Sequence, residues 1–139
     1  MQTVLIAEDA PALRERIEAA LREHGYFTIQ TETAQDALGV LRSVDVDLLL
    51  TRERLADAEG TTLAAMARHR GLEELVIVLL TEEGSTGRPA LESGTVDAVL
   101  GRGADVGSVV RLVRRLLRPV VIRTPAPAVS DAPCALPRA

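Results

Sequence analysis

The sequence predicts an α/β fold in which a doubly wound, five-stranded parallel sheet carries helices on both faces. Three observations support this prediction. Five short apolar runs recur along the chain, longer segments with helical spacing separate them, and glycines close several of those segments. Right-handed crossovers between parallel strands place the helices on both sides of the sheet, so the expected topology is flavodoxin-like.

The five expected strands are rich in Leu, Val and Ile. The first reads TVLIA without interruption, as expected for a strand that is buried on both faces. The fourth, LVIVLL, is the most apolar and is therefore placed centrally in the sheet. The expected ranges are Thr3–Ala7, Tyr26–Gln30, Val46–Thr51, Leu75–Leu80 and Val96–Leu100.

Helical spacing and end signals define the segments between the strands. Pro11 suits the first turn of a helix, and Gly25 suits the left-handed residue that follows its end near His24. Thr33 followed by Asp36 resembles a capping box. The later expected helices are Ala34–Arg42, Thr61–His69, a short turn or helix at Ala90–Ser93, and Val106–Leu117.

The length of 139 residues suits one domain with a short appendage. We expect the domain to span residues 1–118, because Pro119 would stop the last helix. Residues 119–139 are rich in Pro and Ala and have no periodicity, so a tail or linker is expected there.

Composition disfavours several functional classes. No apolar run approaches the roughly 20 residues of a membrane span, and the single cysteine, Cys134, cannot form an internal disulfide. Both observations favour a cytoplasmic protein without a membrane partner. The net charge of −4, with one Tyr and one Phe, gives neither a general attraction to nucleic acid nor a stacking platform for it.

Polar residues follow four of the expected strands. In parallel α/β sheets the ligand site lies beyond the carboxyl ends of the strands, so these residues are expected to converge at one edge. In strand order they are Glu8 with Asp9, Arg52, Thr81 with Glu82, and Arg102.

This arrangement resembles a response-regulator receiver domain of the CheY-like kind over about residues 1–118. In that family an acidic pair after the first strand helps to hold Mg²⁺, and Glu8 and Asp9 match it. A Ser or Thr ends the fourth strand, and Thr81 matches it. The resemblance implies a signalling module that acts on protein partners.

The third strand departs from the family pattern. In the family an aspartate at its end accepts phosphate, whereas this chain has Arg52 at that position, with Glu59-Gly60 falling on the later Asp-Gly. Arg102 replaces the lysine that usually ends the fifth strand, and Val99 falls where an aromatic residue is common. The resemblance therefore implies a degenerate phosphorylation site made of Glu8, Asp9, Arg52, Thr81 and Arg102.

Other carboxylates near the third strand are poor substitutes for the acceptor. Asp45 and Asp47 lie at the far end of that strand. Glu53 is one residue beyond Arg52, where the side chain is expected to turn away. Asp57 lies in the following loop and would need an unusual backbone to return.

Our hypothesis is that Arg52 takes the space and charge of Mg²⁺ by pairing with Glu8 and Asp9. These two acids would then be vestigial metal ligands, and we expect the chain to hold no metal or cofactor. The alternatives are an arginine in solvent, acids that merely favour a helix N-terminus, and an ordinary strand-end hydroxyl at Thr81. Arg102 could meet an anion or extend into water.

Four charged residues form a candidate partner or dimer face. The family habit of pairing through the fourth helix, fifth strand and fifth helix would let them make reciprocal salt links in a two-fold dimer. The alternative is a solvated face opposite the apolar stripe of the last helix. The four residues are Arg88, Asp97, Arg111 and Arg115.

The sequence thus predicts a non-enzymatic pseudo-receiver that binds protein partners in a two-component-type pathway. The alternative is the N-terminal regulatory fragment of a longer regulator with an output domain beyond the tail. A flavin- or nucleotide-binding enzyme is disfavoured, because the acidic loop Glu8–Pro11 lacks the glycines and hydroxyls that cradle phosphate.

Overall fold

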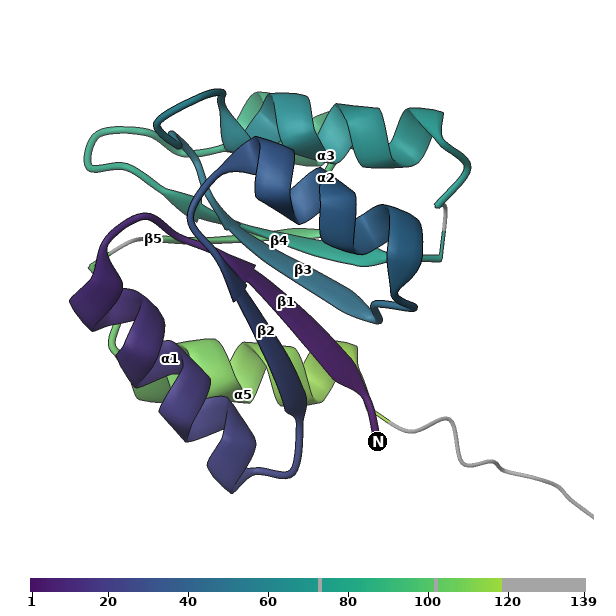
Figure 1. The fold of residues 1–139 in the computed structure, drawn as a ribbon. Coiled ribbons are helices and arrows are strands. Elements are labelled where there is room, and N and C mark those ends of the chain that lie inside the picture. The colour runs from purple at the N-terminus through teal and green to yellow at the C-terminus, as the bar shows by residue number, and fades with distance from the viewer. Residues whose placement is uncertain (73, 102, 119–139) are drawn as a thin grey trace, which may run out of the picture.

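The computed structural model describes residues 1–72, 74–101 and 103–118, so the tail expected at 119–139 lies outside the described residues. Five strands and five helices alternate along the chain. Figure 1 shows the sheet between two layers of helices. The strands are β1 (Thr3–Ala7), β2 (Phe27–Thr31), β3 (Leu48–Arg52), β4 (Val76–Thr81) and β5 (Ala98–Gly101). The helices are α1 (Pro11–Glu23), α2 (Ala34–Ser43), α3 (Gly60–His69), α4 (Arg88–Glu92) and α5 (Val106–Leu116).

All neighbouring strands pair in parallel, in the order β2-β1-β3-β4-β5. Helices α1 and α5 cover one face of the sheet, and α2 and α3 cover the other (Figure 1). The predicted doubly wound, flavodoxin-like fold is therefore confirmed.

The alternation of side chains along the central strands builds two apolar cores. Leu5 and Leu49 face α2 and α3, where Leu63 is fully buried. Ile6 and Leu50 face the other way, toward Ile17 of α1 and the buried side of α5. Both faces of β1 and β3 are thus buried, which accounts for their continuous apolar sequences.

Strand boundaries differ from the expected ones by one or two residues. β3 and β4 each run one residue further than expected, so Arg52 and Thr81 become the last residues of their strands. β5 begins at Ala98, two residues late, because the carboxylate of Asp97 accepts a hydrogen bond from the backbone N–H of Ile77. The later ends of β3 and β4 set Arg52 and Thr81 at the carboxyl edge of the sheet, while the strands themselves are no longer than expected.

Local signals fix the helix ends. Thr33 caps α2 by accepting a hydrogen bond from the N–H of Asp36, as predicted, and Asp105 caps α5 in the same way from Ser108. Gly25 has a φ of 92°, the left-handed conformation expected after α1. Among the described residues, no helix is long and apolar enough to cross a membrane.

Candidate functional site

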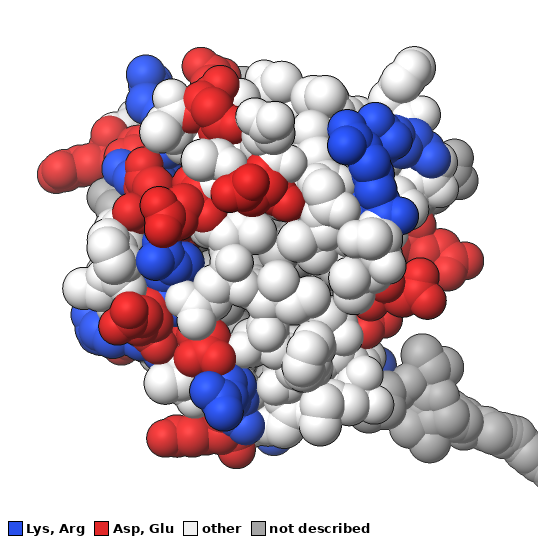
Figure 2. Space-filling model, viewed as in Figure 1, with Lys and Arg blue, Asp and Glu red and all other residues white. Residues whose placement is uncertain are grey.

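The carboxyl ends of β1, β3 and β4 gather an acidic cluster around one arginine. Glu8 and Asp9 follow β1, Arg52 ends β3, and Glu82 follows β4. Figure 2 shows acidic side chains grouped at the left of the view, on the side where the strands end in Figure 1. The parallel register therefore brings together residues separated by more than 40 positions in sequence.

The guanidinium of Arg52 binds three carboxylates. Its Nη1 donates to Asp9 and lies 3.7 Å from Oε2 of Glu8, and its Nε donates to Glu82 over 2.8 Å. The arginine side chain is only 19% exposed, and Glu8 is fully buried. The pairing expected of Arg52 with Glu8 and Asp9 is present, and both acids meet the same nitrogen, Nη1, while Nε serves Glu82.

These contacts favour the protonated form of Arg52, which arginine already has at physiological pH. The hydrogen bond to Glu82 is the main cause that raises the pKa of Arg52, and the hydrogen bond to Asp9 adds to it against the opposing effect of burial. Sequence reasoning missed Glu82 as a partner. The available signal was its position directly after Thr81, on the strand that pairs with β3.

The side chain of Glu53 also reaches the loop between β4 and α4. We expected it to turn away from the site, and that expectation was incomplete. Its Oε1 accepts from the N–H of Glu82 over 2.7 Å, and its Oε2 accepts from the hydroxyl of Ser85 over 2.6 Å. Two successive residues at the end of β3 therefore both hold the β4–α4 loop.

The same loop packs onto Thr81, which is 4% exposed, and onto Val99. Gly87 has a φ of +66°, and a Cβ there would lie 2.8 Å from Cγ1 of Val99 and 2.9 Å from Cγ2 of Thr81. A side chain at position 87 is thus excluded by both conformation and space. Arg102, the remaining residue of the expected site, lies outside the described residues.

Comparison with known proteins identifies the family. The family model of the response regulator receiver domain matches residues 4–102 of the chain. The chain belongs to this family. Among solved structures, the response regulator TrrA from Thermotoga maritima, in complex with Mg²⁺-BeF, has a TM-score of 0.74 and 26% identity, covering 84% of this chain and 100% of TrrA. The non-phosphorylated HemR receiver domain from Leptospira biflexa, at 18% identity and a TM-score of 0.78, shares the fold over 89% of this chain and 100% of its own.

Curated relatives of this receiver are longer than the chain. PilR of Pseudomonas aeruginosa is 31% identical over 84% of this chain and 26% of its own length. The phosphate regulon regulator PhoB of the same organism is 31% identical over 95% of this chain and 56% of its own length. The chain thus spans between about a quarter and just over half of these relatives.

The acids of this receiver do not fit a divalent cation as they stand. The guanidinium of Arg52 already lies between Glu8, Asp9 and Glu82. Within the described ranges, no three His, Cys, Asp or Glu side chains form a group that could hold a metal ion. To bind Mg²⁺, these carboxylate oxygens would first have to lose their contacts with Arg52.

Asp57, one of the alternative acceptors, has a structural contact instead. Its carboxylate accepts from the N–H groups of Ala34 and Gln35, over 2.8 and 3.0 Å, at the start of α2. These two hydrogen bonds lower its pKa. The side chain therefore ties the β3–α3 loop to α2 and is not directed at Arg52.

Asp57→Ala should lower the melting temperature at neutral pH, because the capping hydrogen bonds of α2 are lost. A lowered folded-state pKa contributes stability that is present above the unfolded pKa of about 3.9 and is lost as the pH falls through the folded value. The difference in melting temperature between wild type and variant should therefore shrink below about pH 4. Thermal melts followed by circular dichroism across pH would check this, and a difference that stays constant would contradict it.

The expected partner face is only partly available. Arg88, Arg111 and Arg115 are exposed. Asp97, however, pairs with Arg68 of its own chain over 2.7 Å and also accepts from the N–H of Ile77. Its carboxylate is therefore already engaged within the molecule.

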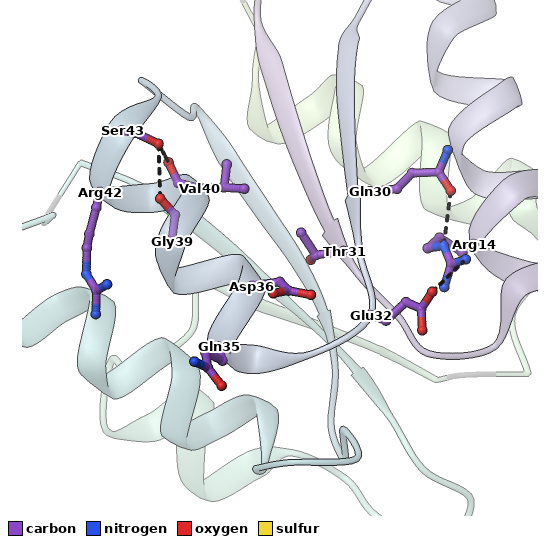
Figure 3. A pocket seen from close by; sticks show the side chains of 10 residues that line it. All are labelled: Arg14, Gln30, Thr31, Glu32, Gln35, Asp36, Gly39, Val40, Arg42 and Ser43. Carbon is purple, nitrogen blue, oxygen red and sulfur yellow. Dashed lines mark hydrogen bonds and ion pairs between the residues drawn. The ribbon is translucent and has the colours of Figure 1, made fainter.

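A hollow in the surface lies beside β2 and α2, away from Arg52. It measures about 670 Å³ and is lined by both charge signs (Figure 3). Arg14 is occupied there, since it donates to Gln30 and lies 3.7 Å from Glu32. Arg42 lies on the side of α2 away from this pair, and the hydroxyl of Ser43 donates to the carbonyl oxygen of Gly39 on the same helix (Figure 3). The mixture of paired charges indicates no particular ligand.

Proposed function

We propose that this chain is a phosphorylation-independent receiver, a pseudo-receiver that signals by binding a protein partner. The proposed module comprises residues 1–118, with residues 119–139 as a tail or linker. One observation carries the proposal: the residue at the end of β3 is an arginine whose guanidinium binds the surrounding carboxylates. The module needs no metal or cofactor, and its partner is a protein, without a nucleic-acid or membrane role.

The chemistry of Arg52 supports this function. A phosphoryl acceptor must offer an oxygen nucleophile, and a guanidinium has only N–H donors and stays protonated. The contacts to Glu82 and Asp9 raise the pKa of Arg52 further. In addition, a cation already balances Glu8 and Asp9, which is the electrostatic role of the divalent ion in phosphorylating receivers.

The loop contacts support a receiver held in a single state. Arg52 binds the side chain of Glu82, while Glu53 binds its backbone N–H and the hydroxyl of Ser85. Charge-assisted hydrogen bonds are roughly twice as strong as neutral ones, and here two consecutive residues make them to one loop. A partner would then recognise a fixed surface, because no phosphate is needed to position the β4–α4 loop.

Arg52→Asp should restore phosphate uptake. The natural chain, incubated with Mg²⁺ and acetyl phosphate, should gain no mass, since Arg52 cannot accept the phosphoryl group. Arg52→Asp should gain the mass of one phosphoryl group, because the new carboxylate joins Glu8 and Asp9 as an Mg²⁺ ligand and serves as the acceptor. Intact-mass spectrometry measures both outcomes.

Arg54→Asp is the matched control, because it makes the same charge change two residues away on an exposed side chain. It should gain no mass, and chelation of Mg²⁺ should abolish the uptake by Arg52→Asp. Mg²⁺-dependent phosphorylation of the natural chain would overturn the proposal and identify a working receiver.

The coverage of the relatives favours a second candidate, the regulatory fragment of a longer regulator. PhoB and PilR extend well beyond the part that this chain matches. In this proposal residues 119–139 link the receiver to an output domain. Reading the gene beyond the codon for Ala139 tests it: an immediate stop codon would rule it out, and a continuing frame would support it.

A homodimer through α4, β5 and α5 is proposed as one form of partner binding. Arg88, Arg111 and Arg115 are exposed and available for it. Asp97 would first have to leave Arg68, so an acid of the second copy other than Asp97 is the better match for these arginines.

A further inference from the structure

A groove rich in arginine lies at the amino edge of the sheet, opposite Arg52. It runs between the end of α5 and the turn that joins α1 to β2, and its volume is about 970 Å³. Helices α1 and α5 lie side by side on this face of the sheet (Figure 1). Its lining residues are Met1, Gln2, His24, Gly25, Tyr26, Arg111, Arg114, Arg115, Leu117 and Arg118.

The charge of the groove is unbalanced. Four arginines and one histidine line it, and none of the lining residues is acidic. In the described part of the chain, no carboxylate lies within 4.0 Å of any of these arginines. Arg111 is partly balanced, since it donates to the hydroxyl of Ser108 and adds to the effect of the hydrogen bonds from Ser108 that lower the pKa of Asp105. This concentration of positive charge stands out in a chain whose net charge is −4.

The helix dipole explains only part of this pattern. Arg114 and Arg115 lie in the last turn of α5, where cations interact favourably with the free carbonyl groups. Arg111 lies a turn earlier and Arg118 beyond the helix end, yet both face the same groove. Helical spacing places the four side chains on the exposed side of α5, opposite its buried residues, and all four border this one hollow.

The floor of the groove is apolar with one hydroxyl. Leu117 is 6% exposed and forms part of the base of the groove. The phenol of Tyr26 is protonated at neutral pH and can donate a hydrogen bond. Burial raises its pKa, against the opposing effect of Arg114 nearby. The groove therefore combines guanidinium groups at the rim with an apolar surface and a donor inside.

We propose that this groove binds an acidic segment of a partner protein, with carboxylates on the arginines and an apolar side chain over Leu117 and Tyr26. Arginine suits this role because its planar guanidinium can donate to a carboxylate through two N–H groups. A nucleic acid fits less well, since the chain has a net charge of −4 and only one tyrosine and one phenylalanine for stacking. The inference rests on the proposed function and deepens it, because it names the surface of the receiver that would bind the protein partner and the chemistry of that partner.

Fluorescence anisotropy with the full chain tests the proposal. The probe is a short fluorescein-labelled synthetic peptide in which glutamates surround one leucine, and the same peptide with glutamines is its control. The glutamate peptide should bind and the glutamine peptide should not. Binding should weaken as salt is raised to about 1 M, where the Debye length falls to about 3 Å.

Charge reversal locates the binding. Arg114→Glu with Arg118→Glu should weaken binding at least tenfold, whereas Arg16→Glu with Arg70→Glu makes the same charge change on exposed arginines elsewhere and should have little effect. Circular dichroism would verify that both variants fold. An absence of peptide binding to the natural chain, or an equal loss in both variants, would overturn the proposal.

Two further outcomes assign the groove to other occupants and also overturn the proposal. One is tighter binding of a single-stranded oligonucleotide than of the glutamate peptide at equal salt. The other is a dimer of the natural chain in sedimentation velocity that excludes the glutamate peptide and that the Arg114→Glu, Arg118→Glu variant abolishes.

Discussion

Replacing Gly60 by alanine should lower the free energy of unfolding by about 3 kcal/mol, the upper part of the range for overpacked sites. A Cβ at this position would lie 2.1 Å from the carbonyl oxygen of Arg52 and 3.0 Å from Oγ1 of Thr51. The first obstacle is backbone, which cannot rotate aside as a flexible side chain would. Either α3 must move away or the end of β3 must shift.

Gly39→Ala provides the matched control, because nothing lies within 4 Å of a Cβ there and the residue is inside α2. This change should raise the free energy of unfolding by about 0.5–1 kcal/mol through better helix propensity. Urea unfolding followed by circular dichroism would measure both. If the two alanine variants moved stability in the same direction, the close approach of α3 to β3 would be wrong.

Arg68→Ala should produce the second large loss, about 2–3 kcal/mol, the scale of one strong charged hydrogen bond together with carbonyls left unsatisfied. The guanidinium donates to the carbonyl oxygens of Leu75 over 2.6 Å and Leu72 over 3.1 Å. It also donates to Thr95 over 3.3 Å and pairs with Asp97 over 2.7 Å. One side chain of α3 thus joins the segments that lead into β4 and β5.

The control for Arg68 is Arg70→Ala, an exposed arginine just past the end of the same helix. Removing the Arg70 side chain should change the urea midpoint little, since surface substitutions usually change the free energy of unfolding by no more than about 0.5 kcal/mol. A midpoint for Arg68→Ala that matches the Arg70→Ala value would show that the four contacts contribute little. Arg68→Lys should recover only part of the loss, because one ammonium cannot reach the spread of acceptors that a guanidinium can.

Much of the fold follows from short-range patterns. The apolar run of Thr3–Ala7, the cap at Thr33 and the glycine at position 25 are each decided by near neighbours, and each is found in the structure as expected. The predicted start of β5 was wrong by two residues, because the true start depends on a contact between Asp97 and Ile77. Such a contact joins two strands, so no periodicity within either strand records it.

The candidate site was predictable in position and less so in detail. The order of strands places Glu8, Asp9 and Arg52 at one edge, and that much follows from topology. The contacts of Arg52 with Glu82 and of Glu53 with Ser85 span about 30 residues and depend on side-chain rotamers in a glycine-containing loop. Sequence reasoning had compared Arg52 only with the acids that the family pattern emphasised, so these contacts were not foreseen.

The close fit of Gly87 against Thr81 and Val99 links the permitted residues at two distant positions. The loop occupies the volume that a larger residue at position 99 would need, and the small valine is what lets the loop lie there. A descendant of this chain that acquired an aromatic ring at 99 would have to lift the loop, and a side chain at 87 would demand the same. Position 87 is therefore held to glycine by its backbone conformation and by space, and the size of the residue at 99 has an upper limit for as long as the loop lies there.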